Sequence, residues 1–233
     1  MIRNFLFSIL FFTGIIVISI IFLPSFFLPK QAVLLGGKLM GHWAGFCLKF
    51  VLSVKIFIKG KENIINNEKF FIAASHQSMF ETFYLQAIFN SPIFILKKEL
   101  MFIPIFGWYL KKIGSISIKR DKVTKDNINF FTNIKNKINK TQRPLIIFPQ
   151  GTRVNPDERP PFKKGAARIY KELKISCQPV AINSGQVWPK KGLKKINKEI
   201  IISILPIIEF GMEKNDFIKI LENKIYTELN NIS

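Results

Sequence analysis

A run without any charged side chain, from Asn4 to Pro29, constrains the fold of this chain more than any other feature. About 20 consecutive apolar residues let a helix cross the hydrocarbon core of a bilayer, and this run is longer. A cleaved signal peptide would have a shorter apolar core and small residues at its cleavage site, and the sequence SFFLPKQ at 25–31 offers neither. We therefore expect a membrane segment that is retained.

Two arrangements of this segment remain open. One is a helix that spans the bilayer, and the other is a hairpin that dips into one leaflet, with bends near Pro24 and Pro29. A second apolar stretch follows at 31–54, and its Trp43, His42 and separated lysines suit the headgroup level. We expect residues 1–50 to form the anchor and residues 51–233 to form one further domain.

The charge of the chain is strongly positive. There are 35 Lys and Arg against 15 Asp and Glu, a net charge of +20. Such a charge suits an anionic membrane surface or nucleic acid. The aromatic residues, however, fall largely within apolar runs, and the whole chain is rich in Ile, Lys, Asn and Phe. We therefore give the charge little weight and keep a membrane-bound nucleic-acid-binding protein only as the alternative from another functional class.

From about Val54 the pattern changes to short elements separated by turns. Apolar runs at 69–75 and 144–149 are typical of strands buried in a parallel sheet, and 54–60, 177–183 and 200–208 also have strand patterns. Helical spacing predicts helices at 82–89, 122–140 and 217–229. This alternation predicts an α/β fold, a mainly parallel sheet flanked by helices. Cys47 and Cys177 are isolated, so we expect neither a disulfide nor a zinc site. This favours a catalytic portion that faces a reducing compartment, the cytoplasm.

Histidine is the usual general base near neutral pH, and the chain has two. His42 lies in the second apolar stretch, where a core or interfacial role is the better interpretation. His76 directly follows the strand at 69–75, at the end of the sheet where ligands collect in open α/β folds. Glu81 can reach back to orient the His76 imidazole, as the acid of a catalytic triad does. Ser78-x-x-Glu81 is equally a capping box, and the spacing leaves both roles open.

Four further segments place polar groups next to predicted elements. At 146–156 a buried strand leads into a turn in which Gly151 allows close backbone approach and Arg153 suits a phosphate, unless this is an ordinary turn with a surface Arg. A helix expected at 160–173 has Lys163 and Lys164 near its positive N-terminal end, either to meet an anion or as a solvated charged face. An alternating strand is expected to end near Arg120, which places a guanidinium at a strand end and by itself indicates only a basic surface. The sequence Asn-Ser-Gly at the end of the strand at 177–183 indicates a turn.

Taken in order, four blocks of sequence resemble those of the glycerolipid acyltransferases, and most of all the bacterial 1-acyl-sn-glycerol-3-phosphate acyltransferases. The blocks are HQSMFE (76–81), KKEL with IPIFGW and GSISIKR (97–120), FPQGTR (148–153) and VAINSGQVWP (180–189). The resemblance covers roughly residues 54–208. It implies the α/β fold of that family behind a short N-terminal membrane motif.

The resemblance also implies roles for individual residues. His76 would take the proton from the sn-2 hydroxyl of lysophosphatidic acid, and Glu81, in the place of the Asp of the HX4D motif, would orient it. Arg153 would bind the acceptor phosphate, with Arg120 and Lys97 as helpers.

Two positions depart from the family pattern. Glu81 adds one methylene to the usual Asp, and Gln150 replaces the Glu of FPEGTR, which removes a negative charge but keeps hydrogen bonding. The amide near Gly151 is implied to stabilise the oxyanion of the acyl thioester. No Ser or Cys stands in a motif suited to an acyl-enzyme, and no metal-ligand cluster occurs. We therefore expect direct transfer in a ternary complex, with no cofactor and no metal.

The expected activity is transfer of a fatty acyl group to lysophosphatidic acid, which gives phosphatidic acid for phospholipid biosynthesis. The co-substrate is acyl-CoA or acyl-acyl carrier protein, and the sequence does not separate the two. Another acceptor, such as lyso-ornithine lipid, is the alternative within the same class, although two arginines favour a phosphate. The expected partners are both substrates, anionic membrane lipids and, for the second donor, acyl carrier protein, with no nucleic acid. The expected location is the cytoplasmic face of the inner membrane.

Overall fold

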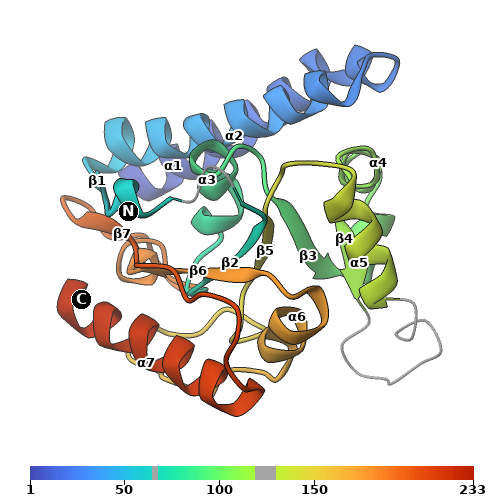
Figure 1. Cartoon of the computed structure of the whole chain (residues 1–233). Coiled ribbons are helices and arrows are strands. Elements are labelled where there is room, and N and C mark those ends of the chain that lie inside the picture. The colour runs from blue at the N-terminus through green and yellow to red at the C-terminus, as the bar shows by residue number, and fades with distance from the viewer. Residues whose placement is uncertain (65–67, 119–129) are drawn as a thin grey trace.

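The computed structural model describes residues 1–64, 68–118 and 130–233. Within them, one seven-stranded sheet has the order β1-β7-β6-β2-β5-β3-β4 (Figure 1). The strands are β1 Lys55–Lys59, β2 Phe70–Ala74, β3 Ile93–Lys97, β4 Ile116–Ile118, β5 Leu145–Ile147, β6 Ser176–Ile182 and β7 Glu199–Ile204.

Neighbouring strands pair in parallel except β6 and β7, which are antiparallel. The central strand β2 is buried at every position, as expected for a continuous apolar run covered on both faces. The predicted fold class, a mainly parallel α/β sheet, is therefore confirmed. Because β2, β5 and β3 run in the same direction, their carboxyl ends lie along one edge of the sheet.

Helices cover both faces of the sheet (Figure 1). Alternate residues of β2 enter two separate cores, with Phe70 and Ile72 facing α1, α2 and α3 and with Phe71 facing α5, α6 and α7. The α-helices are α1 Ile2–Ile21, α2 Lys30–Leu52, α3 Phe80–Ile88, α4 Phe106–Lys112, α5 Phe130–Asn139, α6 Gly165–Leu173 and α7 Lys214–Ile232. The short 3-10 helices are η1 Leu23–Phe26, η2 Lys61–Asn63, η3 Lys98–Phe102 and η5 Ser184–Gln186.

The N-terminal helices α1 and α2 form a hairpin that lies across the top of the sheet in Figure 1. Phe7 and Phe11 of α1 are buried in the same core as the sheet, and each ring meets Trp188 edge-on with centroids 5.1 Å apart. Arg3 Nε donates to the carbonyl of Val51 at 2.7 Å, which fastens the start of α1 to the end of α2. The first half of α1 is therefore part of the core, whereas the turn at η1 extends beyond it.

Most predicted elements are confirmed. The strand patterns at 54–60, 69–75, 144–149 and 177–183 correspond to β1, β2, β5 and β6, and the helices at 82–89, 160–173 and 217–229 to α3, α6 and α7. The strand expected at 200–208 ends at Ile204, because Pro206 has no N–H to continue the ladder. Of the helix expected at 122–140, the described part is α5.

Candidate functional site

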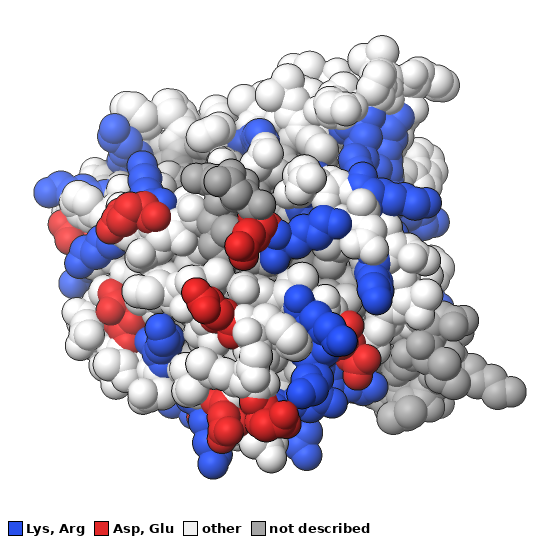
Figure 2. Space-filling model, viewed as in Figure 1, with Lys and Arg blue, Asp and Glu red and all other residues white. Residues whose placement is uncertain are grey.

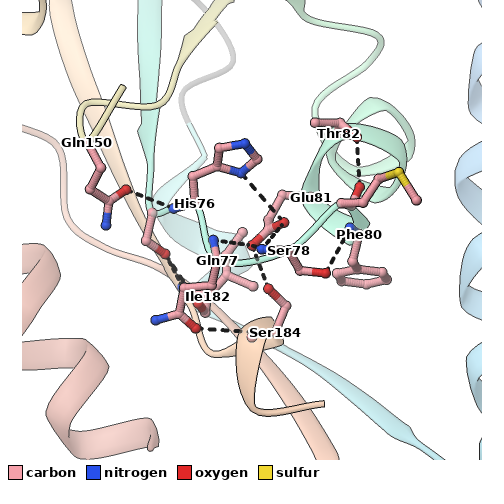
Figure 3. Close-up of polar contacts among 12 residues, drawn as sticks. His76, Gln77, Ser78, Phe80, Glu81, Thr82, Gln150, Ile182 and Ser184 are labelled. Atoms are coloured by element: carbon pink, nitrogen blue, oxygen red, sulfur yellow. Dashed lines mark hydrogen bonds and ion pairs between the residues drawn. The ribbon is translucent and has the colours of Figure 1, made fainter. Parts of the chain in front are cut away.

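The candidate site lies at the carboxyl edge of the sheet, where the chain leaves the neighbouring strands β2 and β5 (Figure 3). His76 follows β2 and is held through its backbone by the loop after β5. Its N–H donates to Gln150 Oε1 at 2.8 Å, and its carbonyl accepts from the N–H of Val154 at 2.9 Å. Its ring stacks on Phe148, with centroids 4.0 Å apart and planes 17° apart. The imidazole is thus fixed on one face and only 14% exposed.

Glu81 is fully buried in the first turn of α3. Its Oε1 accepts from the backbone N–H groups of Gln77 and Ser78, both at 3.0 Å, and Ser78 N–H also reaches Oε2 at 3.1 Å. Its Oε2 lies 3.8 Å from Nδ1 of His76, and the two side chains point toward one another in Figure 3. Both roles left open by the spacing therefore occur together, since one carboxylate caps the turn and faces the imidazole.

The separation of 3.8 Å is longer than a hydrogen bond. Nδ1 of His76 is buried and has no hydrogen-bond partner in the part of the chain that the structure describes. Glu81 is the carboxylate in ion-pair range of that nitrogen. Catalytic contacts of this kind are often long without substrate and shorten when it binds. The pair therefore has the arrangement of a base and its orienting acid.

The turn after β6, which the sequence indicated only as a turn, donates hydrogen bonds to Glu81 and to the neighbouring Gln77. The hydroxyl of Ser184 donates to Glu81 Oε1 at 2.5 Å, and the N–H of Gly185 donates to Gln77 Oε1 at 3.2 Å. A Cβ on Gly185 would lie 2.7 Å from Cβ of Gln77, so this approach requires glycine. Sequence reasoning missed Ser184 and Gln77. The adjacency of β6 and β2 is the signal that reveals them.

The loop after β5 carries Gln150, Gly151 and Arg153. Gly151 has φ +77°, a backbone conformation that favours glycine, and its N–H donates to the carbonyl of Phe148 at 2.9 Å. This amide is thus engaged in the turn, and its assignment to an oxyanion stays a prediction. Gln150 is buried and binds the His76 N–H, so the departure from Glu retains an acceptor at this place.

Arg153 lies beside the backbone contact between Val154 and His76, and its side chain is partly exposed. The ammonium of Lys190 donates to the carbonyl of Arg153 at 3.2 Å. The stem of Lys163 runs over Gly151, with its Cγ 3.3 Å from where a Cβ would stand. Three cationic side chains therefore surround this loop, and Lys190 among them was missed because nothing in its local sequence points to the loop.

The two expected helper residues have different outcomes. Lys97 ends β3, whose carboxyl end lies next to that of β5, so it stands exposed on the same edge of the sheet as Arg153. Arg120 lies outside the described residues. The phosphate role of both stays a prediction. Within the described ranges, no group of three or more His, Cys, Asp or Glu side chains is placed to hold a metal ion.

The amino-acid sequence of this chain is similar to those of known proteins. The chain is 30% identical over 168 residues to the 1-acyl-sn-glycerol-3-phosphate acyltransferase of Pseudomonas aeruginosa, an alignment that covers 71% of this chain and 65% of that relative. It is 39% identical over 126 residues to the enzyme of the same name from Helicobacter pylori, covering 53% and 52%. The chain thus spans between about half and two thirds of the length of these relatives.

A solved structure has the same fold. The 1-acyl-sn-glycerophosphate acyltransferase of Thermotoga maritima superimposes with a TM-score of 0.79 at 20% identity, covering 100% of this chain and 98% of that one. The sequence model described as Acyltransferase matches residues 55–183, more than half of the chain and the part that carries His76, Glu81 and Arg153. This chain belongs to the Acyltransferase family.

Proposed function

We propose that this protein transfers a fatty acyl group from an acyl thioester to the sn-2 hydroxyl of lysophosphatidic acid and forms phosphatidic acid. The observation that carries the proposal is the His76–Glu81 pair on the sheet edge that also carries Arg153. The relatives of this chain are named for 1-acyl-sn-glycerol 3-phosphate, an acceptor that has one free hydroxyl beside a phosphate. A base and a guanidinium on neighbouring loops fit those two groups.

His76 acts as the general base. A proton on Nδ1, the nitrogen that faces Glu81, leaves the lone pair on Nε2, which is directed away from the carboxylate (Figure 3) and is free to meet the acceptor. Nε2 removes the hydroxyl proton while the acceptor oxygen attacks the thioester carbonyl. When the tetrahedral intermediate collapses, the carbon–sulfur bond breaks and the thiol leaves with the proton from His76. Glu81 stabilises the imidazolium that exists between the two steps.

The hydroxyl comes from the acceptor and not from the protein. Ser75, Ser78 and Ser184 are all fully buried, and each hydroxyl oxygen already takes part in a hydrogen bond within the protein. The thiol of Cys47 is also buried, and burial raises its pKa to about 11, which leaves little thiolate at neutral pH. Direct transfer between two bound substrates, without a cofactor, follows as the proposed route.

Arg153 binds the acceptor phosphate, assisted by the neighbouring ammonium groups of Lys163 and Lys190. A guanidinium forms two parallel hydrogen bonds with a phosphate, which fixes its orientation as well as its position. This favours lysophosphatidic acid over an acceptor without phosphate, such as lyso-ornithine lipid. The donor is an acyl thioester of coenzyme A or of acyl carrier protein.

The hairpin anchors the protein in one leaflet and does not span the bilayer. The helix α1 is long and apolar enough to enter a membrane. Its inner face is packed on the core through Phe7 and Phe11, while its outer face stays apolar along the whole helix, from Phe5 to Ile20. A spanning helix would have to leave that core. A hairpin that lies in one leaflet keeps its contact with the core and its contact with lipid, and we place it on the cytoplasmic face of the inner membrane.

The proposal is tested with a panel of acceptors and purified protein in mixed micelles. Lysophosphatidic acid, glycerol 3-phosphate, lyso-ornithine lipid and lysophosphatidylcholine are each offered with labelled acyl-CoA and with labelled acyl-acyl carrier protein. We expect labelled phosphatidic acid from lysophosphatidic acid with at least one donor. Faster acylation of lyso-ornithine lipid than of lysophosphatidic acid would contradict the proposed acceptor.

A further inference from the structure

A segment outside the site carries a concentration of exposed apolar side chains. It is the stretch 100–108, the "apolar segment", which comprises the end of η3, the start of α4 and the connection between them. Phe102 is 74% exposed and Trp108 57% exposed, and Ile103 and Phe106 are also exposed. Apolar surface gathered in one place is unfavourable in water and indicates a contact surface.

The apolar segment is joined to the far end of the N-terminal hairpin. Phe26 of η1 stacks on Tyr109 with centroids 4.5 Å apart and meets Trp108 edge-on at 6.2 Å. The ammonium of Lys112 donates to the carbonyl of Leu28 at 2.7 Å, in the turn between α1 and α2. The exposed apolar side chains of the hairpin turn and of the apolar segment therefore form one continuous surface.

Basic side chains border this surface. Four lysines stand against one acid, Glu99, within residues 93–118. Figure 2 shows Lys and Arg gathered at the upper right of the face in view, below an uncharged top, where Figure 1 places the hairpin turn and α4. An apolar centre with a cationic border matches hydrocarbon beneath anionic headgroups.

The position of the apolar segment in the sheet connects it to the site. It follows β3, and β3 is separated from β2 only by β5. Neighbouring strands are about 4.8 Å apart, so the segment leaves the sheet roughly 10 Å from the strand that carries His76. A membrane contact here would bring the carboxyl edge of the sheet to the lipid surface.

We propose that the apolar segment is a second bilayer contact, which inserts beside the hairpin turn and holds the edge that carries His76 against an anionic lipid surface. The occupant is the bilayer because the segment continues the apolar surface of the hairpin and has a cationic border. The purpose of the contact rests on the proposed function, in which the acceptor is a lipid. Binding of the apolar segment to the bilayer can be measured whether or not the protein transfers an acyl group.

The first test measures the depth of Trp108 in vesicles of phosphatidylglycerol and phosphatidylcholine whose acyl chains carry bromine, a short-range quencher of indole emission. The chain has three tryptophans, so the quenching of Trp108 is the difference between the wild type and Trp108→Phe. We expect bound wild-type protein to lose clearly more emission than bound Trp108→Phe. Equal fractional quenching of the two proteins would overturn the proposal.

The second test removes the apolar side chains in the variant Phe102→Ser/Trp108→Ser. We expect its vesicle partition coefficient to fall at least tenfold, and its KM for vesicle-borne lysophosphatidic acid to rise, while turnover of a short-chain, water-soluble acceptor is unchanged. Phe210→Ser, an exposed aromatic elsewhere on the protein, is the matched control and leaves partition unchanged. Lys98→Gln/Lys111→Gln is expected to weaken binding about fivefold per lysine.

The remaining outcomes each decide the question. Unchanged partition and KM in the double variant would refute the second contact even if the acceptor panel succeeds. Dimers of wild-type protein in detergent-free solution that become monomers in the double variant would assign the surface to a second copy of the chain. Quenching of Trp108 without any acyl transfer would leave the contact standing and refute the proposed function.

Discussion

The hydroxyl of Ser184 donates a hydrogen bond to Oε1 of Glu81, across a sequence separation of 103 residues. Because Oε2 of the same carboxylate lies 3.8 Å from Nδ1 of His76, the turn after β6 fixes the position of the acid beside the imidazole. Ser184 is fully buried, and its hydroxyl contacts the carboxylate of Glu81. In the proposed mechanism, Ser184 is therefore a positioning residue for Glu81.

Ser184→Ala should lower kcat about tenfold and leave the KM for both substrates nearly unchanged, because one charge-assisted hydrogen bond to Glu81 is lost. Steady-state kinetics with lysophosphatidic acid provide the measurement, and Ser184→Thr should restore part of the rate. Ser203→Ala is the matched control. The buried Ser203 donates a hydrogen bond of 2.6 Å to Glu228 in the same way, and this pair is not in contact with His76. A similar loss of kcat in the control would assign Ser184 a merely structural role.

His76→Ala should lower turnover on the order of 10³-fold, the range of a lost general base. Its partition into vesicles should equal that of the wild type, because the hairpin and the apolar segment are untouched. His42→Ala, at an exposed position on the outer face of α2, should keep full turnover. Near-wild-type turnover in purified His76→Ala would refute the mechanism.

Arg153→Ala should raise the KM for lysophosphatidic acid between about 10- and 100-fold, the cost of losing a charged hydrogen-bond pair to the phosphate. The weak acylation of a phosphate-free acceptor should change little. Lys219→Ala, which removes an exposed cation from α7, serves as the control for net charge. An equal loss with both acceptors would contradict the assignment of Arg153 to the phosphate.

Gly185→Ala should destabilise the protein by about 1–3 kcal/mol, because the new Cβ would lie 2.7 Å from Cβ of Gln77 and 3.1 Å from Pro156. For a chain of this size, each kcal/mol lowers Tm by roughly 2–4 °C, which thermal unfolding in detergent can measure. Turnover should also fall, since Gln77 borders Glu81. Gly165→Ala meets no atom within 4 Å and should leave Tm unchanged or slightly higher. Equal Tm values for the two variants would rule out a tight approach at Gly185.

The elements that could be predicted from the sequence are those whose hydrophobic pattern follows their burial in the fold. The continuous run at 70–74 is buried on both faces, and the period of α7 follows its one buried face. The strand β3 was missed because its five residues run into Lys97 and Lys98 without a turn signal. The helix α4 was missed because much of its apolar surface is exposed, so its pattern does not follow burial in a core.

The candidate site divides in the same way. His76, Glu81 and Arg153 were identified because each follows a recognisable strand, and the order of β2 and β5 in the sheet places them on one edge. Ser184 and Lys190 could not be identified, because their role depends on which strands are neighbours. A serine in a turn has no local pattern that distinguishes a bond to a buried carboxylate from a bond to water.

The backbone of His76 is held at both its N–H and its carbonyl by the loop that carries Arg153. The two hydrogen bonds therefore tie the backbone of the histidine to the loop of Arg153, which limits how far the two can move apart. In the proposed complex, where Arg153 holds the phosphate, this restraint would favour a hydroxyl at a set number of bonds from the phosphorus. It would accept the hydroxyl on the carbon next to the phosphate-bearing one and pass over a more distant one, so regioselectivity would follow from the hydrogen bonds of a single histidine backbone.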